Sequence, residues 1–137
     1  MTRPRLLAVG IGCRAGVSAE AIAELVDKTL ADIGEETTPV ALFTVVDKQG
    51  EVGIAEAAAR LGFALVHLPR AALAAVADRV ETRSERVVEL FGVPSVAEAA
   101  ALAGAGPDAR LLVPRRAERG ATVAVAVSGH PIEEPTP

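Results

Sequence analysis

The chain has 137 residues, a formal net charge of −4 and a sequence pI near 5.2. This length is typical of one domain that buries its own core, and the acidic balance argues against a nucleic-acid partner. A single cysteine excludes an intramolecular disulfide, and no apolar run reaches the roughly 20 residues that span a bilayer. The first residues do not resemble a signal peptide, so we expect a cytoplasmic protein without a membrane partner.

The first predicted unit is a strand, a glycine-rich loop and a helix, within LLAVGIGCRAGVS at residues 6–18 and the segment that follows. Apolar residues follow one another in 6–11 without polar alternation, which predicts a strand buried on both faces. Ser18 is a suitable N-cap for a helix over 19–33, where apolar residues recur at helical spacing.

The loop between that strand and helix contains Gly10, Gly12 and Gly16, which permit a tight turn. Backbone N–H groups of such a loop lie near the positive end of the helix dipole. We therefore expect the loop to favour a phosphate, a carboxylate or a thiolate.

The other predicted elements alternate between strands and helices. Strands are predicted at 40–46, 63–68, 110–113 and 123–127, and helices at 51–61 and 70–80, the first of these helices ended by Gly62. Two further helices begin at capping boxes: one runs from the Thr82/Glu85 box to Gly92, and one covers 96–103 after the Ser95/Glu98 box and is ended by Gly104. The polar turn 114–120 is expected to join the last two strands as an antiparallel hairpin.

This order predicts a three-layer α/β/α sandwich with a mainly parallel five-stranded sheet and one antiparallel edge strand. Residues 1–127 are expected to form a single domain. Residues 128–137 contain three prolines and are expected to form a flexible tail that adds little to stability.

Ligands of open parallel sheets bind beyond the carboxyl ends of the strands, which selects a short set of candidate residues. The predicted ligand-binding residues are Gly10, Gly12, Cys13, Arg14, Gly16, Ser18, Asp47, Lys48, Arg115 and Arg116, the candidate catalytic residues are Cys13 and His67, and no metal site is predicted. Each has a structural alternative: Asp47 and Lys48 can cap a helix and pair together, His67 can be a hydrogen-bonded core residue, and surface arginines are usually solvated.

Cys13 supports an enzyme hypothesis. It precedes a helix N-terminus and lies beside Arg14, surroundings that lower a thiol pKa, and CRAGVS is similar to the active-site loop of rhodanese-type sulfurtransferases. The alternative is a small buried apolar cysteine without a chemical role.

Three segments together resemble one family: VGIGCRAGVSAEAI at 9–22, VVDKQGEVGIAEAAARLG at 45–62 and GVPSVAEAAAL at 92–102. They are similar to the cobalamin-biosynthesis family of CobE and the C-terminal domain of CbiG, and the strand ATVAVAV extends the resemblance to 5–127. The order of residues 49–51 departs from the family pattern, which leaves the role of Lys48 open.

The resemblance implies a role in corrin-ring synthesis, with a precorrin or other corrinoid as ligand or substrate and no further cofactor. CbiG proteins open a lactone on a cobalt-precorrin ring, but with additional N-terminal domains that this chain is expected to lack, so an enzymatic activity stays open. Precorrin carboxylates would match Arg14, Lys48, Arg115 and Arg116. Two alternatives remain: a Cys13-dependent sulfurtransferase, and a module that docks on other cobalamin-pathway enzymes.

Overall fold

The computed structural model describes residues 6–34, 40–85, 87–88 and 95–129. Its elements, in chain order, are β1 (Leu7–Cys13), α1 (Ala19–Ile33), β2 (Val40–Val45), the 3-10 turn η1 (Val46–Lys48), α2 (Val52–Leu61), β3 (Ala64–Leu68), α3 (Arg70–Ala74), the 3-10 turn η2 (Ala77–Arg79), α5 (Val96–Ala105), β4 (Arg110–Glu118) and β5 (Ala121–Val127). The sheet order is β3-β2-β1-β5-β4. The predicted α/β sandwich with a five-stranded sheet is confirmed; the sheet is parallel from β3 to β1, and both pairings of β5 are antiparallel.

β1 is the central strand, and its residues from Leu7 to Gly12 are all buried. It pairs in parallel with β2, where Val9 lies opposite Leu42, and antiparallel with β5, where Val9 lies opposite Val125. An unbroken apolar run suits this position because neighbouring strands and two helical layers remove every side chain from water. The predicted burial on both faces is confirmed.

The sequence predicted an antiparallel strand at the edge of the sheet, but the antiparallel strand lies in the interior. It is β5, which lies between β1 and β4 and runs antiparallel to both. All but one of the residues of ATVAVAV are buried, whereas β4 carries several charged residues that stay in contact with water. The apolar strand therefore takes the interior position and the polar strand takes the edge.

The hairpin that joins these strands is tighter than predicted. β4 continues through the expected turn to Glu118, and only Arg119 and Gly120 connect it to β5. Pro114 had indicated a turn, but β4 pairs with β5 on one side only, and its register shifts between Val113 and Arg116. A bulge on an edge strand accommodates a residue without a backbone N–H.

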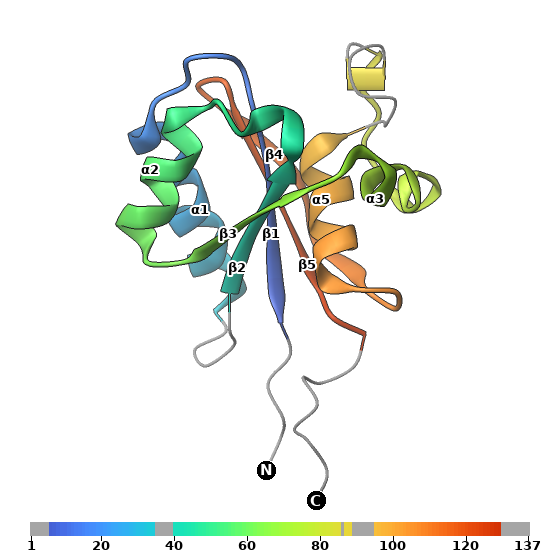
Figure 1. Cartoon of the computed structure of the whole chain (residues 1–137). Helices are drawn as coiled ribbons and strands as arrows, with labels where there is room; N and C mark the ends of the chain where they lie inside the picture. Colours follow the sequence, from blue (N-terminus) through green and yellow to red (C-terminus); the bar gives the residue numbers. More distant parts are fainter. Residues whose placement is uncertain (1–5, 35–39, 86, 89–94, 130–137) are drawn as a thin grey trace, which may run out of the picture.

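Helices cover both faces of the sheet (Figure 1). α1 and α2 pack on one face, over a core that includes Ile11, Ile22 and Ile54. α5 and α3 lie on the other face, where α5 packs its alanines closely against β1, β5 and Phe43 of β2. No helix among the described residues is long and apolar enough to cross a membrane.

Several helix ends agree with the local sequence signals. Ser18 Oγ accepts a hydrogen bond from the Ala21 N–H at 3.1 Å, and Gly34 and Gly62 end α1 and α2 at positive φ. Ser95 Oγ likewise accepts from the Glu98 N–H. These ends were predictable because each depends on residues within one turn of the helix.

Other ends differ from the prediction. α5 continues through Gly104, where a Cβ would lie 2.5 Å from the Phe43 ring, so this glycine allows close packing rather than ending the helix. The helix expected over 70–80 ends at Ala74, because Leu73 is its one buried residue and little packing holds a longer helix.

The segment after η2 and the end of the chain lie partly outside the described residues. Thr82 is not a cap: Ser84 Oγ accepts from the Val87 N–H, while the predicted end of that helix near Gly92 is not described. Ser128, expected in the tail, exchanges two hydrogen bonds with Leu6, each 3.1 Å long. The ordered structure therefore extends past Val127, and the predicted tail at 130–137 lies outside the described residues.

Candidate functional site

A cavity of about 590 Å³ lies at the carboxyl end of β1. Because β4 runs in the same direction as β1, the β4–β5 turn lies at the same edge of the sheet. The cavity is lined by Gly12, Cys13, Arg14, Ala15, Lys48, Ser84, Val87, Ser95, Val96, Arg115, Ala117, Glu118, Arg119, Gly120, Ala121 and Thr122. Its volume is typical of small-molecule sites.

Five of the predicted ligand-binding residues are brought together here. They are Gly12, Cys13, Arg14, Lys48 and Arg115. Four lining residues are basic although the whole chain is acidic: Arg14, Lys48, Arg115 and Arg119, of which Arg119 pairs its guanidinium with Glu24 on α1. Glu118 is the acidic residue among the described lining residues. Lys28 binds the Glu118 carboxylate at 3.0 Å, so this charge is partly offset. The cavity is therefore suited to an anionic ligand.

The glycine loop does not form the expected cradle of free amides. The Arg14 N–H donates to the Gly120 carbonyl at 2.9 Å, and the Gly16 N–H donates to Glu51 Oε2 at 3.1 Å. Gly16 and Ser18 line a separate cavity whose rim includes the Glu51 carboxylate. Through these contacts the loop joins β1 to the hairpin and to α2. Because these backbone N–H groups are already occupied, ligand recognition in the basic cavity depends on side chains.

Gly10 and Gly12 have different surroundings although both lie in β1. A Cβ at Gly10 would lie 1.8 Å from the Ala97 carbonyl oxygen, so Gly10 permits α5 to approach the sheet and does not line the cavity. A Cβ at Gly12 would lie 2.6 Å from Thr122 Oγ1, within the cavity wall. Neither glycine has a positive φ. Their role is close approach rather than an unusual backbone conformation.

Lys48 and Cys13 are in contact within the cavity lining. Lys48 Nζ donates a 2.8 Å hydrogen bond to the Cys13 carbonyl, which directs the ammonium group toward the end of β1. Burial raises the pKa of the Cys13 thiol; the Lys48 charge lowers this pKa by a smaller amount, and Glu51 raises it again. The thiol is therefore predominantly protonated at neutral pH, which disfavours a nucleophilic role.

Alkylation of Cys13 by iodoacetamide should report an apparent pKa above about 8.5, the value of an unperturbed thiol. Lys48→Met should raise this pKa further and Glu51→Gln should lower it, because the two charges act in opposite directions. Rate against pH for the three proteins is the measurement. An apparent pKa below about 7.5 in the wild type would restore the sulfurtransferase hypothesis.

Asp47 and His67 lie outside the cavity lining. Arg70 binds the Asp47 carboxylate through two nitrogens, with Nε 2.9 Å from Oδ1, and this contact holds the Asp47 pKa below its usual range. The pair joins η1, which carries Lys48, to the start of α3. His67 lies on the edge strand β3 opposite Thr44, partly exposed. Its catalytic role stays a prediction without support from its position.

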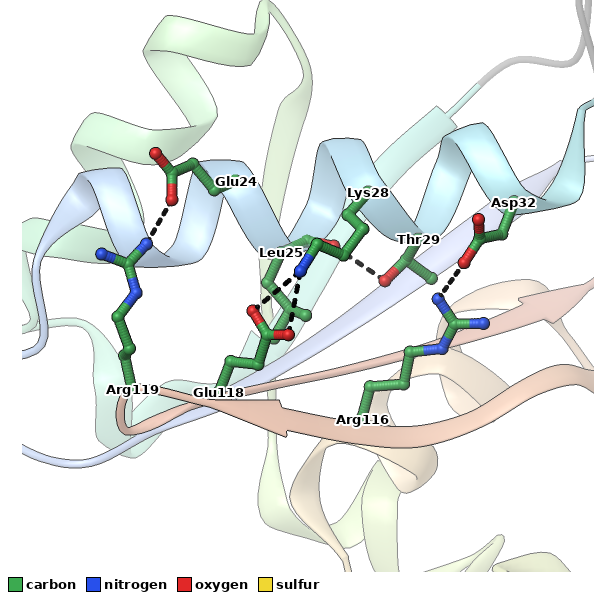
Figure 2. A network of polar contacts seen from close by, with 8 residues as sticks. All are labelled: Glu24, Leu25, Lys28, Thr29, Asp32, Arg116, Glu118 and Arg119. Carbon is green, nitrogen blue, oxygen red and sulfur yellow. Dashed lines mark hydrogen bonds and ion pairs between the residues drawn. The ribbon is translucent and has the colours of Figure 1, made fainter.

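Arg115 and Arg116 are adjacent in β4, and the cavity lining includes only Arg115. Arg116 Nη1 lies 2.6 Å from Asp32 Oδ2 on α1 (Figure 2), on the other face of the sheet. We therefore omit Arg116 from the site. The side chain of Arg115 makes no hydrogen bond or ion pair with the described residues, which leaves its guanidinium available to a ligand.

Glu98, a fully buried carboxylate at the start of α5, has a role that was not predicted from the sequence. Its Oε1 accepts from the Glu81 and Thr82 N–H groups, and its Oε2 accepts from Thr82 Oγ1 and the Arg115 N–H, at 2.7–2.8 Å. Burial acts to raise the pKa of Glu98, but the hydrogen bonds together hold it below its usual value.

Glu98 thereby fixes two walls of the cavity. The Arg115 N–H lies in the bulge and donates to Glu98, and residues 81–82 lead directly to Ser84 in the lining. The sequence signal was available: α5 is apolar on all sides, and a helix of this kind is buried together with any charge it carries. Arg119 was also missed, since the predicted loop was longer than the actual turn.

Sequence and structure comparisons identify relatives over nearly the whole chain. The profile of the family described as "Cobalamin synthesis G C-terminus" matches residues 7–126. Protein CobE of Sinorhizobium sp is 35% identical over 88% of this chain and 79% of its own length. The cobalt-precorrin-5A hydrolase of Priestia megaterium is 32% identical over 91% of this chain, which spans 33% of that enzyme.

Solved structures give the same result. The crystal structure of CobE, a protein from the cobalamin (vitamin B12) biosynthetic pathway, superposes with a TM-score of 0.83 at 35% identity, covering 93% of both chains. The cobalamin biosynthesis protein chiG from Agrobacterium tumefaciens str. C58 gives 0.68 at 34% identity, covering 90% of this chain and 99% of that one. This chain is a cobalamin-biosynthesis protein and belongs to the CobE/CbiG C-terminal family.

Proposed function

We propose that the protein binds a precorrin or related corrinoid in the basic cavity at the carboxyl end of β1. The observation that carries this proposal is the combination of the cavity's volume, about 590 Å³, with its four basic lining residues. A precorrin carries acetate and propionate carboxylates around an apolar ring, and guanidinium and ammonium groups bind carboxylates through charge-assisted hydrogen bonds.

The rest of the lining supports the same ligand class. Val87, Val96 and several alanines offer apolar contact to a macrocycle. Ser95 and Val96 also place the N-terminus of α5 at the cavity, where the helix dipole favours negative charge. The hydrolase relative acts, by its name, on a cobalt-precorrin, which agrees with a tetrapyrrole ligand. The raised pKa of Cys13 gives no support to a Cys13 nucleophile, so the proposal concerns binding.

Arg14→Ala and Arg115→Ala should each weaken the binding of hydrogenobyrinic acid by about 1.5–3 kcal/mol, because each removes a charge-assisted contact. Absorbance titration measures the Kd. The matched control is Arg116→Ala, which removes the same charge from the adjacent residue of the same strand but on the other face.

Two results would contradict the proposal. The first is no binding of hydrogenobyrinic acid to the wild type at tens of micromolar. The second is an equal loss of affinity in all three arginine variants, which would mean that net charge rather than the cavity attracts the ligand. Raising the ionic strength should weaken binding to the wild type more than to Arg115→Ala, because screening acts on each charge contact.

A further inference from the structure

The turn between β4 and β5 places an arginine in a backbone conformation that disfavours it. Arg119 has φ +49° and Gly120 has φ +83°, and Arg119 is the one non-glycine residue with positive φ in the described part of the chain. Two-residue hairpin turns with positive φ at both positions favour asparagine, aspartate or glycine at the first. An arginine there lowers the stability of the turn.

The contacts that Arg119 makes within the protein do not require this arginine. Its Nη2 binds Glu24 Oε2 on α1 (Figure 2), but both side chains are more than half exposed, and exposed ion pairs contribute little stability. Two neighbouring pairs, Lys28–Glu118 and Asp32–Arg116, already join β4 to the same helix. Backbone strain that no stabilising contact within the protein offsets is typical of a functional position.

The turn is also part of the cavity wall. Arg119 and Gly120 both line the cavity, and the Gly120 carbonyl accepts the Arg14 N–H at 2.9 Å. A Cβ at Gly120 would lie only 3.8 Å from Arg14 Cβ, so the hairpin turn and the glycine loop are in contact. Arg119 therefore lies at the rim of the basic cavity, and its side chain extends from there so that the guanidinium binds Glu24 on the surface of α1.

We propose that Arg119 is a ligand-binding residue whose guanidinium exchanges the Glu24 carboxylate for a carboxylate of the bound corrinoid. This inference rests on the proposed function and adds a specificity: the site prefers a corrinoid with free carboxylates over one whose carboxylates are amidated. Glu24 is the competing anion in the ligand-free protein. The guanidinium stays paired in both states, so the exchange avoids an unpaired charge at the rim.

The test compares Arg119→Asn with Arg116→Asn. Asparagine suits positive φ, so Arg119→Asn should melt at the wild-type temperature or roughly 2–4 °C higher. Its Kd for hydrogenobyrinic acid should be at least about fivefold weaker, and its Kd for the fully amidated corrinoid should equal that of the wild type. Arg116→Asn removes an ion pair of the same kind outside the cavity and should leave both Kd values unchanged.

Glu24→Gln completes the test, because it removes the competing anion and keeps the side-chain shape. It should bind hydrogenobyrinic acid about two- to threefold more tightly. The inference is overturned if Arg119→Asn binds less than about fivefold weaker, melts below the wild type, or if Glu24→Gln gains no affinity. If the wild type still binds hydrogenobyrinic acid tightly, each of these results leaves the proposed corrinoid-binding function unaffected. If the wild type does not bind hydrogenobyrinic acid, both the proposed function and the role of Arg119 are overturned.

Discussion

Glu98→Ala is expected to destabilise the protein by about 3–5 kcal/mol, because three backbone N–H groups and one hydroxyl, all partly buried, lose their fully buried acceptor. Urea unfolding followed by circular dichroism measures the free energy of unfolding. Glu81→Ala is the matched control, since it removes an exposed carboxylate from the same cluster and keeps the Glu81 N–H. The control should change stability by less than about 0.5 kcal/mol.

The same variant should change how stability depends on pH. Hydrogen bonds hold the pKa of Glu98 below that of the unfolded chain, about 4.3 for a free glutamate. In acid, the unfolded state therefore binds more protons at this residue, and stability falls as pH falls from that value through the folded pKa. Glu98→Ala should lack this part of the acid loss. An unchanged slope between about pH 5 and pH 3 would contradict the role given to the Glu98 carboxylate.

Gly10→Ala is expected to cost about 3 kcal/mol, at the upper end of the range for overpacking a core. The added Cβ would lie 1.8 Å from the Ala97 carbonyl oxygen and 2.6 Å from the Ala101 nitrogen. Both are backbone atoms of α5, so the helix itself has to move away from the sheet. Thermal unfolding measures the effect, which should appear without any ligand.

Two other glycines provide the comparison for Gly10. Gly50 has no atom within 4 Å of its Cβ position and no positive φ, so Gly50→Ala should be within about 0.5 kcal/mol of the wild type. Gly12→Ala meets only the Thr122 hydroxyl closely, a side chain that can rotate, and should affect corrinoid binding more than stability. Equal melting temperatures for Gly10→Ala and Gly50→Ala would show that the contact between β1 and α5 is looser than described.

The difference between Gly10 and Gly12 shows where sequence reasoning about the site reached its limit. Both glycines belong to one glycine-rich segment, and the same anion-binding role was predicted for both. Both lie on the face of β1 that is turned to α5, which is almost 90 residues away in sequence, because residues two apart in a strand share a face. The structure separates them because the backbone of α5 packs directly on Gly10, whereas Gly12 lies beside Val96 at the start of that helix, in the cavity wall. No local pattern in the segment specifies that contact.

The adjacent arginines of β4 make the same point for charge. Both Arg115 and Arg116 were predicted from the sequence to contact a ligand. In the structure Arg116 forms an ion pair with Asp32, and only Arg115 lines the cavity. The assignment depends on the bulge near Pro114 and on Glu98, which accepts the Arg115 N–H in place of a partner on β5. Arg119 could be assigned to the site only once the hairpin was known to turn in two residues.

The order of strands and helices, the caps at Ser18, Gly62 and Ser95, and the family could be predicted from the sequence alone, because these depend on residues close together along the chain. The tertiary structure decided the interior position of β5, the partners of Glu98 and the set of arginines that share one cavity. Those features depend on contacts between residues far apart in sequence, whose geometry follows from how the layers pack and how the strands register.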